Sequence, residues 1–401
     1  MTGRSHRPAS GGDAVRSAGA DDNAAHGPDI PLDVAERALG VVTVDLAAVA
    51  RNWRSLAGLV APAECAGVVK ADAYGLGASR VIPALMEAGC RTFFVATLDE
   101  ALHCRRCAPQ AIVHVLDGVT VADALIAHDL VPVLSTAADI DAWATACARS
   151  GRPLRAALHI DTGLNRLGLD VATPEGRRAV RDRLASVEVT LVMSHLACAD
   201  EPDHPMNAEQ LQRFVARRGI VPGARASLAA SDGLMLGAAY HFDLVRPGYA
   251  LYGGQAFGGG RTPVETVVEV AAKILQVRTV PIGESVGYGA SWTASTPRRV
   301  ATLPAGYADG VFRHLSAASG QVGGVVAVRG RRCPIVGRVS MDLTTVDVTD
   351  VPGSPVEAGE WAELIGRSVT IEEVGRRAGT IGYEVLTRLS RRFHRVYRGG
   401  A

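Results

Sequence analysis

The chain has 401 residues, of which 48% are apolar, and its 42 lysines and arginines nearly balance 41 aspartates and glutamates. A formal net charge of +1 gives no field that would attract nucleic acid, and no apolar stretch reaches the roughly 20 residues that a membrane span needs. Seven scattered cysteines are typical of a reducing compartment, so we expect a cytoplasmic protein without a metal site.

The first 38 residues are rich in Gly, Ala, Ser, Asp and Arg and lack the hydrophobic segment of a secretion signal. We interpret residues 1–38 as a disordered extension.

From residue 39 onward, short apolar runs alternate with segments that carry Ala and Leu at helical spacing. The expected strands lie near 65–70, 92–97, 111–116, 130–135, 155–161, 189–196, 224–231 and 242–248. Two parallel strands that follow each other in sequence need a crossover connection, which is usually a helix. This alternation therefore predicts an α/β domain over residues 39–265, a parallel (β/α)8 barrel of the TIM type. A doubly wound open sheet is the alternative, but no G-x-G-x-x-G follows an early strand.

The pattern changes near residue 265. From Val267 onward, β-rich runs follow one another without intervening helices, and Gly and Pro separate them as turns. Residues 266–401 are therefore predicted to form a separate, all-β C-terminal domain.

Only two lysines occur in the chain, Lys70 and Lys273. Lys70 ends an apolar run that begins at Cys65, where partial desolvation would lower the pKa of its amine from about 10.4 toward neutrality. A neutral amine can attack a carbonyl group and form a Schiff base. We interpret Lys273 as an ordinary solvated charge.

Polar residues follow other predicted strands at their carboxyl ends, where the active site of a parallel barrel lies. The loop 161–166 and the side chains of His195 and Arg246 join Lys70 on this rim. Taken alone, His195 also fits a core histidine, and Arg246 also fits a partner of a structural carboxylate. Their common position favours a site.

The turns 231–233 and 246–249 follow the seventh and eighth predicted strands, where barrels of this type often bind phosphate. Gly248 would let backbone N–H groups approach an anion, and the Ser231 hydroxyl would donate a hydrogen bond to it. A Schiff-base lysine combined with a phosphate cradle indicates a site for pyridoxal phosphate.

With these motifs in place, the chain resembles the alanine racemases, which are fold-type III pyridoxal phosphate enzymes. The matching segments are Val-Val-Lys-Ala-Asp-Ala-Tyr-Gly (68–75), His-Ile-Asp-Thr-Gly-Leu-Asn-Arg-Leu-Gly (159–168), Ser-His-Leu-Ala-Cys-Ala-Asp (194–200), Asp-Leu-Val-Arg-Pro-Gly (243–248), Ala-Leu-Tyr-Gly (250–253), Val-Gly-Tyr-Gly-Ala (286–290), Gly-Tyr-Ala-Asp-Gly (306–310), Gly-Arg-Val-Ser-Met-Asp (337–342) and Ile-Gly-Tyr-Glu (381–384). The resemblance covers residues from about 40 to 398.

The resemblance implies racemisation between L-alanine and D-alanine, with D-alanine supplied for peptidoglycan. Two bases are the direct solution to removing a proton from one face of Cα and returning it to the other. By resemblance, Lys70 serves one face and binds the cofactor, and Tyr288 serves the other. In this family the tyrosine comes from the second subunit, which implies a homodimer with composite active sites.

The resemblance also assigns supporting roles. Arg246, with His195 beside it, should face the pyridine nitrogen of the cofactor, where its charge weakens the ring as an electron sink. Arg166 should contact the phenolic oxygen of the cofactor and the substrate carboxylate, and the backbone N–H of Met341 should bind that carboxylate from the partner. The phosphate should be held by Tyr74, Ser231, Gly248, Tyr249 and Tyr383. The substrate access corridor should include Tyr307, Arg313 and Asp342.

Two positions depart from the family pattern. Many members carry a lysine, modified to a carbamate, where this chain has His159, so Arg166 needs support from a chloride or another side chain. Ala230 stands where an asparagine often precedes the serine of the phosphate loop.

Three other functions remain as alternatives. A broad-specificity or serine racemase on the same scaffold would differ in pocket volume. A decarboxylase would need an acidic partner for the pyridine nitrogen, which Arg246 disfavours. A non-catalytic pyridoxal-phosphate-binding protein would not need the β domain that carries Tyr288 and Met341.

Overall fold

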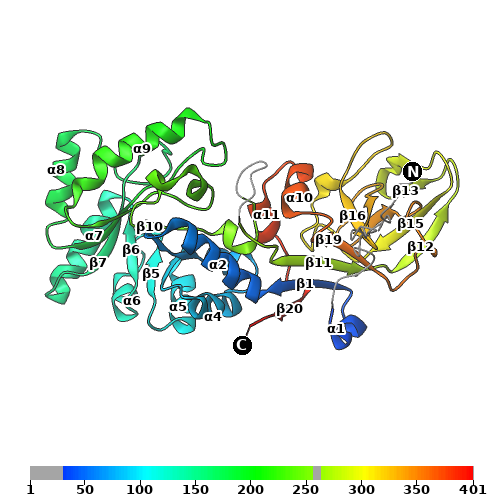
Figure 1. The fold of residues 1–401 in the computed structure, drawn as a ribbon, viewed down its shortest axis with the longest axis horizontal. Coiled ribbons are helices and arrows are strands. Elements are labelled where there is room, and N and C mark those ends of the chain that lie inside the picture. The colour runs from blue at the N-terminus through cyan, green and yellow to red at the C-terminus, as the bar shows by residue number, and fades with distance from the viewer. Residues whose placement is uncertain (1–29, 256–262, 401) are drawn as a thin grey trace, which may run out of the picture.

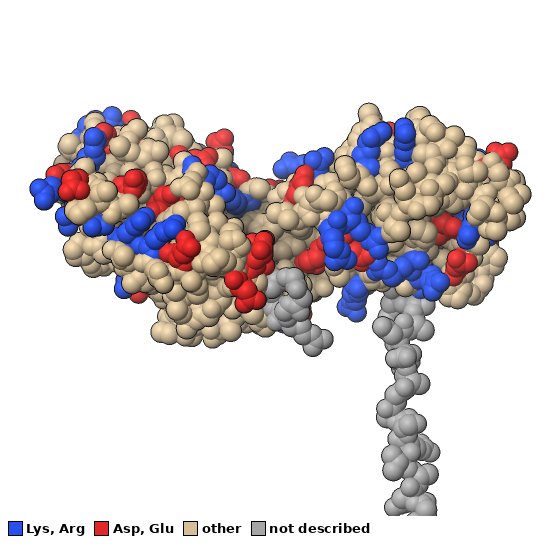
Figure 2. Space-filling model, turned by 90° about the horizontal axis from the view of Figure 1, so that it is seen from above, with Lys and Arg blue, Asp and Glu red and all other residues tan. Residues whose placement is uncertain are grey.

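The computed structural model describes residues 30–255 and 263–400, which form two lobes side by side (Figure 1). Most of the predicted N-terminal extension lies outside these residues. On the face shown in Figure 2, basic and acidic side chains are interspersed over both lobes. Within the described residues, no helix is long and apolar enough to cross a membrane.

The first lobe is the predicted parallel barrel. One parallel sheet has the order β3-β4-β5-β6-β7-β8-β9, so strands that are neighbours in sequence are neighbours in space. Its strands are β3 (Gly67–Val68), β4 (Thr92–Val95), β5 (Ile112–Val115), β6 (Val131–Leu134), β7 (Arg155–His159), β8 (Glu188–Met193) and β9 (Arg225–Ser227). Strands such as β4 are buried along their whole length, as expected where helices cover a parallel sheet.

The ring closes through β10 (Leu244–Val245) and β2 (Glu64–Cys65), which pair in parallel. The N–H of Arg246 donates to the carbonyl of Ala229 at 3.0 Å, which links the end of β10 to the segment after β9. Because β2 runs directly into β3, the two act as one strand that pairs with β10 on one side and β4 on the other. The barrel therefore has the eight strands that the sequence predicts.

Helices separate these strands along the chain. They are α2 (Leu46–Val60), α4 (Ala78–Ala88), α5 (Leu98–Cys107), α6 (Ala122–Ala127), α7 (Ala137–Ser150), α8 (Pro174–Arg183) and α9 (Pro205–Arg217), with the short 3-10 turns η1 (Arg218–Ile220), η2 (Asp232–Leu236), η3 (Ala238–Tyr240) and η4 (Tyr249–Tyr252). Local sequence fixes their starts: Thr97 and Thr136 each form a capping box at the N-termini of α5 and α7.

The second lobe is β-rich. Its largest sheet has the order β17-β16-β19-β11-β1-β20. The strands of this lobe are β1 (Gly40–Asp45), β11 (Val268–Lys273), β12 (Gln276–Val280), β13 (Ser285–Val286), β14 (Trp292–Thr293), β15 (Arg298–Leu303), β16 (Val325–Val328), β17 (Arg331–Pro334), β18 (Thr344–Asp347), β19 (Trp361–Ile365) and β20 (His394–Arg398). It also contains η5 (Tyr288–Ala290), η6 (Arg313–Leu315) and two helices that sequence reasoning did not anticipate, α10 (Ile371–Ala378) and α11 (Gly382–Thr387).

Strand β1 belongs to this second sheet, although we expected the barrel domain to begin at residue 39. It pairs antiparallel with β11 and parallel with β20, and its residues 41–44 are buried. A strand flanked on both edges in this way is a central strand, and its apolar run reflects that burial. The predicted domain boundary near residue 265 falls just before β11 and stays a prediction.

The last part of the predicted extension is ordered, because residues Leu32–Arg37 form helix α1 with Val34 buried. Lys273 contacts this helix through a hydrogen bond from its amine to the carbonyl of Ala35, and its amine lies 5.3 Å from the centre of the Trp361 ring. The interpretation of Lys273 as an ordinary solvated charge was therefore wrong: it links α1 to the sheet.

Candidate active site

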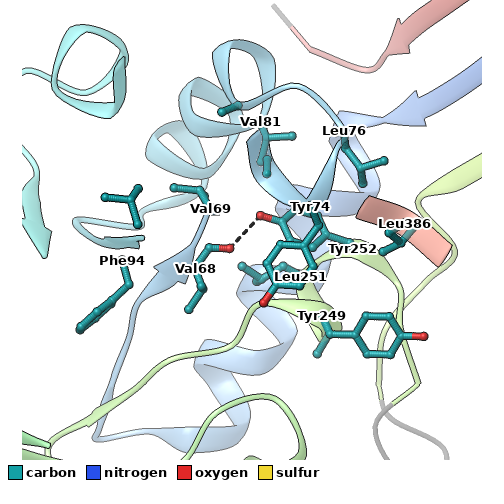
Figure 3. Close-up of a cluster of buried hydrophobic side chains, with 14 of the residues drawn as sticks. Val68, Val69, Tyr74, Leu76, Val81, Phe94, Tyr249, Leu251, Tyr252 and Leu386 are labelled. Carbon is teal, nitrogen blue, oxygen red and sulfur yellow. Dashed lines mark hydrogen bonds between the residues drawn. The ribbon is translucent and has the colours of Figure 1, made fainter. Parts of the chain in front are cut away.

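Lys70 begins a left-handed helical turn, α3 (Lys70–Tyr74), directly after the first barrel strand. Residues 71–74 all have φ between 53° and 57°, although none is a glycine. Such a conformation costs roughly 1–2 kcal/mol per residue, so surrounding contacts must hold it. Glu100 accepts from the N–H of Ala71 at 2.6 Å, and Asp72 accepts from the N–H of Ala78 at 2.8 Å. The turn brings the Tyr74 ring back into the buried cluster shown in Figure 3.

The Lys70 amine is half-buried on the rim of the barrel. Burial is the main cause that lowers the pKa of Lys70, and the positive charge of Arg166 lowers it further, whereas Glu100 and Asp117 oppose the shift. This is the desolvated amine that the sequence predicts. The N–H of Val68 donates to the carbonyl of Pro247 at 3.0 Å, so Lys70 leaves its strand beside the loop 246–249.

Arg246 is buried at the end of β10, and its acceptors within the described residues are neutral. It donates to the hydroxyl of Ser227 and to the carbonyl of Ser194, the latter at 2.7 Å. Its NH2 group also lies 3.4 Å from Nδ1 of His195. Burial lowers the pKa of Arg246 to about 10, so the guanidinium remains charged at neutral pH. The alternative pairing with a structural carboxylate is therefore not what the fold provides.

The histidines of the barrel interior are neutral. The pKa of His195 is lowered to about 3, first by burial and then by Arg246. The pKa of His159 is lowered to about 4 by the same two causes, and its Nδ1 lies 3.3 Å from the hydroxyl of Ser135. Arg166 is exposed on its loop, and its positive charge contributes to the lowered pKa values of Lys70, His159 and His195.

The two turns predicted to bind phosphate, 231–233 and 246–249, are joined by hydrogen bonds after the seventh and eighth strands, and we call them the cradle. The Ser231 hydroxyl accepts from the N–H groups of Gly248 and Ala250, at 3.0 and 3.2 Å. A hydroxyl that accepts in this way still carries one proton to donate. The N–H of Gly248, which we expected to approach an anion, donates to Ser231 instead. A Cβ at position 248 would overlap the Tyr74 hydroxyl and lie 3.2 Å from Cβ of Val68, which explains why a glycine occurs there.

Four tyrosines surround this cradle: Tyr74, Tyr249, Tyr252 and Tyr383. Figure 3 shows the first three together, with the hydroxyl of Tyr252 donating to the carbonyl of Val68 at 2.9 Å. Sequence reasoning missed Tyr252, although its position three residues after Tyr249 on one short turn was a usable signal. Burial raises the pKa values of all four phenols, which therefore stay protonated.

Two of these phenols donate to carboxylates that we did not predict. Tyr383 donates to Asp232 and Tyr249 donates to Glu372, each at 2.9 Å. The hydroxyl of Tyr249, expected near the phosphate, is thus directed at the second lobe instead.

These groups fit pyridoxal phosphate. The amine of Lys70 suits an aldehyde, and the hydroxyls of Ser231 and Tyr74 suit a phosphate. The guanidinium of Arg246 is a donor for a ring nitrogen. Among the described residues, no group of three or more His, Cys, Asp or Glu side chains is arranged to hold a metal ion.

Among the predicted site residues of the C-terminal domain, Tyr383 reaches the cradle, whereas Tyr288 and Met341 lie on exposed turns. Tyr288 and Met341 are 71% and 54% exposed, and β13, which leads into Tyr288, lies at the far end of the second lobe in Figure 1. Tyr307 and Arg313 line one cavity of about 560 Å³, whereas Asp342 lines a different one.

Comparison with known proteins links both lobes to one enzyme family. The family model described as "Alanine racemase, N-terminal domain" matches residues 44–256, and that described as "Alanine racemase, C-terminal domain" matches residues 267–397. The chain is 50% identical over 360 residues to an alanine racemase of Methylobacterium sp. (strain 4-46), covering 89% of this chain and 97% of that protein. It is 48% identical over 368 residues to an alanine racemase of Rhodospirillum rubrum, covering 91% and 97%. The solved alanine racemase from Bartonella henselae with covalently bound pyridoxal phosphate has a TM-score of 0.84 and 38% identity, covering 90% of this chain and 99% of that one.

Proposed function

Because this chain belongs to the alanine racemase family, we propose that two copies of it interconvert L-alanine and D-alanine with Lys70 and Tyr288 as the two bases. The reaction is the racemisation of alanine with pyridoxal phosphate as cofactor. One observation carries the two-base arrangement: the half-buried amine of Lys70 adjoins a phosphate cradle in one domain, while Tyr288 stands exposed in the other.

Lys70 is the group that would hold the cofactor and move a proton on one face of the substrate. When bound, the cofactor supplies an electron sink that stabilises negative charge on the substrate Cα. Because burial and Arg166 lower the pKa of Lys70, its amine is closer to the neutral form that acts as nucleophile and base.

Arg246 would donate to the ring nitrogen while remaining charged, which disfavours protonation of that nitrogen and moderates the electron sink. A moderate sink suits fast return of the proton to Cα and opposes loss of the amino group. Neutral His195 lies beside the guanidinium, within 3.4 Å, and keeps it oriented without neutralising it.

The second copy would contribute the other face of the site. Tyr288 would hold or accept a proton opposite Lys70, and the backbone N–H of Met341 would bind the substrate carboxylate together with Arg166. The exposure of Tyr288 and Met341 supports this assignment. A phenol that acts as a base but does not contact the barrel of its own chain must contact the barrel of a second chain. Tyr307, Arg313 and Asp342 would line the access to the composite site.

We assign the reaction to the cytoplasm, with D-alanine destined for peptidoglycan. The cysteines within the described residues are free and mostly buried, which agrees with a reducing compartment.

The substrate is tested by incubating the purified protein with a panel of L- and D-amino acids and following the α-proton in heavy water. Alanine should exchange fastest in both enantiomers. Faster exchange of serine would instead support a serine racemase, and loss of carbon dioxide would indicate a decarboxylase.

The composite site is tested by subunit exchange. Lys70→Ala and Tyr288→Phe homodimers should both have little activity, whereas mixing them should restore one working site in each heterodimer. Failure to recover activity after verified exchange would mean that each site is built within one chain.

A further inference from the structure

Two tyrosine–carboxylate pairs join the barrel to the second lobe beside the phosphate cradle. Tyr383 on α11 donates to Asp232 of the barrel, and Tyr249 of the barrel donates to Glu372 on α10, each at 2.9 Å. The two phenol rings stack, with centroids 4.2 Å apart and planes 18° from parallel. In one pair the second lobe supplies the phenol and the barrel supplies the carboxylate, and in the other pair the roles are reversed.

Tyr383 can donate only one hydrogen bond, because a phenol carries a single proton. Burial and the negative charge of Asp232 raise the pKa of Tyr383, so that proton is retained at neutral pH. Its acceptor here is a carboxylate, and hydrogen bonds to ionised acceptors are roughly twice as strong as neutral ones. A second acceptor for the same proton must displace Asp232.

Asp232 lies next to the place where that second acceptor would bind. It follows Ser231, whose hydroxyl accepts from the N–H groups of Gly248 and Ala250. Its partner Tyr383 has its ring centroid 6.0 Å from that of Tyr74, and the Tyr74 hydroxyl reaches Gly248 of the cradle. The negative charge of Asp232 also contributes to the raised pKa of Tyr74, after burial.

We propose that Asp232 competes with the phosphate of the cofactor for the hydroxyl proton of Tyr383, and so acts as a positioning residue that sets cofactor affinity. This inference rests on the proposed function, because it takes the phosphate to bind at the cradle. Without the cofactor, Asp232 keeps the Tyr383 ring stacked on Tyr249. When the cofactor binds, the Tyr383 hydroxyl would donate to its phosphate, and the Asp232 carboxylate would then lie beside a second negative charge.

The competition is measured by titrating cofactor-free, full-length protein with pyridoxal phosphate and following visible absorbance. Asp232→Asn keeps an oxygen that accepts from Tyr383 but removes the charge. The dissociation constant should fall about tenfold, the size expected when a charged acceptor becomes a neutral one. Far-ultraviolet circular dichroism verifies that the variant is folded.

A double-mutant cycle separates competition from plain charge repulsion. Tyr383→Phe should weaken cofactor binding, and Asp232→Asn in that background should then have much less effect than in the wild type. An undiminished effect would overturn the proposal, because repulsion alone needs no phenol proton. No effect of Asp232→Asn in either background would overturn it as well.

Two controls complete the test. Glu372→Gln removes the charge of the neighbouring pair and should change the dissociation constant much less than Asp232→Asn does; an equal change would contradict a specific role for Asp232. Pyridoxal, which lacks the phosphate, should bind Asp232→Asn and wild type equally, and a preference for the variant would argue against competition. If wild type bound no pyridoxal phosphate at all, the proposed function itself would be wrong, which is a distinct result.

Discussion

The barrel rim and the C-terminal domain carry their predicted site residues in opposite ways. On the rim, Lys70, Ser231 and Arg246 are buried or half-buried, and the latter two are held by hydrogen bonds within one chain. In the C-terminal domain, Tyr288 and Met341 project from exposed turns, 71% and 54% exposed. The comparison indicates that one half of the site is organised by the fold of a single chain, and it supports the proposal that a second copy completes the other half.

The largest effect should come from Lys70, since the rim depends on this one amine. Lys70→Ala should abolish the visible absorbance of bound cofactor and all racemisation. Lys273→Ala, which alters only the contacts with α1 and the Trp361 ring, should keep both. Absorbance spectra of the two purified variants measure this difference. If the band were lost in Lys273→Ala and kept in Lys70→Ala, Lys273 would be the lysine that binds the cofactor.

Tyr288→Phe tests the other half. Removing a positioned acid–base group costs roughly 10²–10⁴-fold in rate, so racemisation should fall by that factor in both directions. By family resemblance Lys70 faces the D-substrate hydrogen, so α-hydrogen exchange from D-alanine in heavy water should survive far better than exchange from L-alanine. The control is Tyr240→Phe, a tyrosine on η3 of the barrel, which should behave like wild type. Equal loss of exchange from both enantiomers would support a single base.

Gly248→Ala tests how tightly the rim is packed. The added methyl group meets the Tyr74 hydroxyl and Cβ of Val68, and overpacking typically costs about 1–3 kcal/mol. We expect lower thermal stability and weaker cofactor binding. Gly219→Ala is the matched control, because no atom lies within 4 Å of a Cβ built there. Equal melting temperatures for the two variants would mean that the cradle has more room than its contacts indicate.

His114→Phe should have the smallest effect, visible only in the pH dependence of stability. Burial lowers the pKa of His114 to about 3, and its ring stacks on Phe94 with centroids 4.5 Å apart. Between that value and the ordinary pKa of about 6.5, the unfolded state binds a proton that the folded state does not, so stability falls as the pH falls. His114 contributes up to about 1.4 kcal/mol per pH unit to this loss of unfolding free energy. The loss should therefore be smaller by up to that amount in His114→Phe. Urea unfolding at pH 7, 6 and 5 measures the slope, which should not change in the exposed-site variant His128→Gln.

Three of the predicted site residues follow barrel strands in the structure, as the sequence indicated. Lys70, Ser231 and Arg246 were predictable because a parallel barrel gathers the carboxyl ends of its strands, whatever the details of packing. Asp232 and Glu372 were missed as partners of the two phenols, because their contacts span 151 and 123 residues of chain. The positive φ values of residues 71–74 were equally invisible, since their sequence, Ala-Asp-Ala-Tyr, contains no glycine to announce a left-handed turn.

Strand β1 has a consequence for how this chain is made. It leaves the ribosome before the barrel, yet both of its neighbours, β11 and β20, are synthesised after the barrel is complete. During synthesis the barrel can fold while β1 waits with its backbone unpaired, and the second sheet is finished only when the last strand arrives. A fragment that begins at residue 266 would lack a central strand, and adding back a peptide of residues 30–45 should restore its fold. Strands from the first and last parts of the described residues, β1 and β20, are therefore joined in one sheet, and the barrel is an insertion between them.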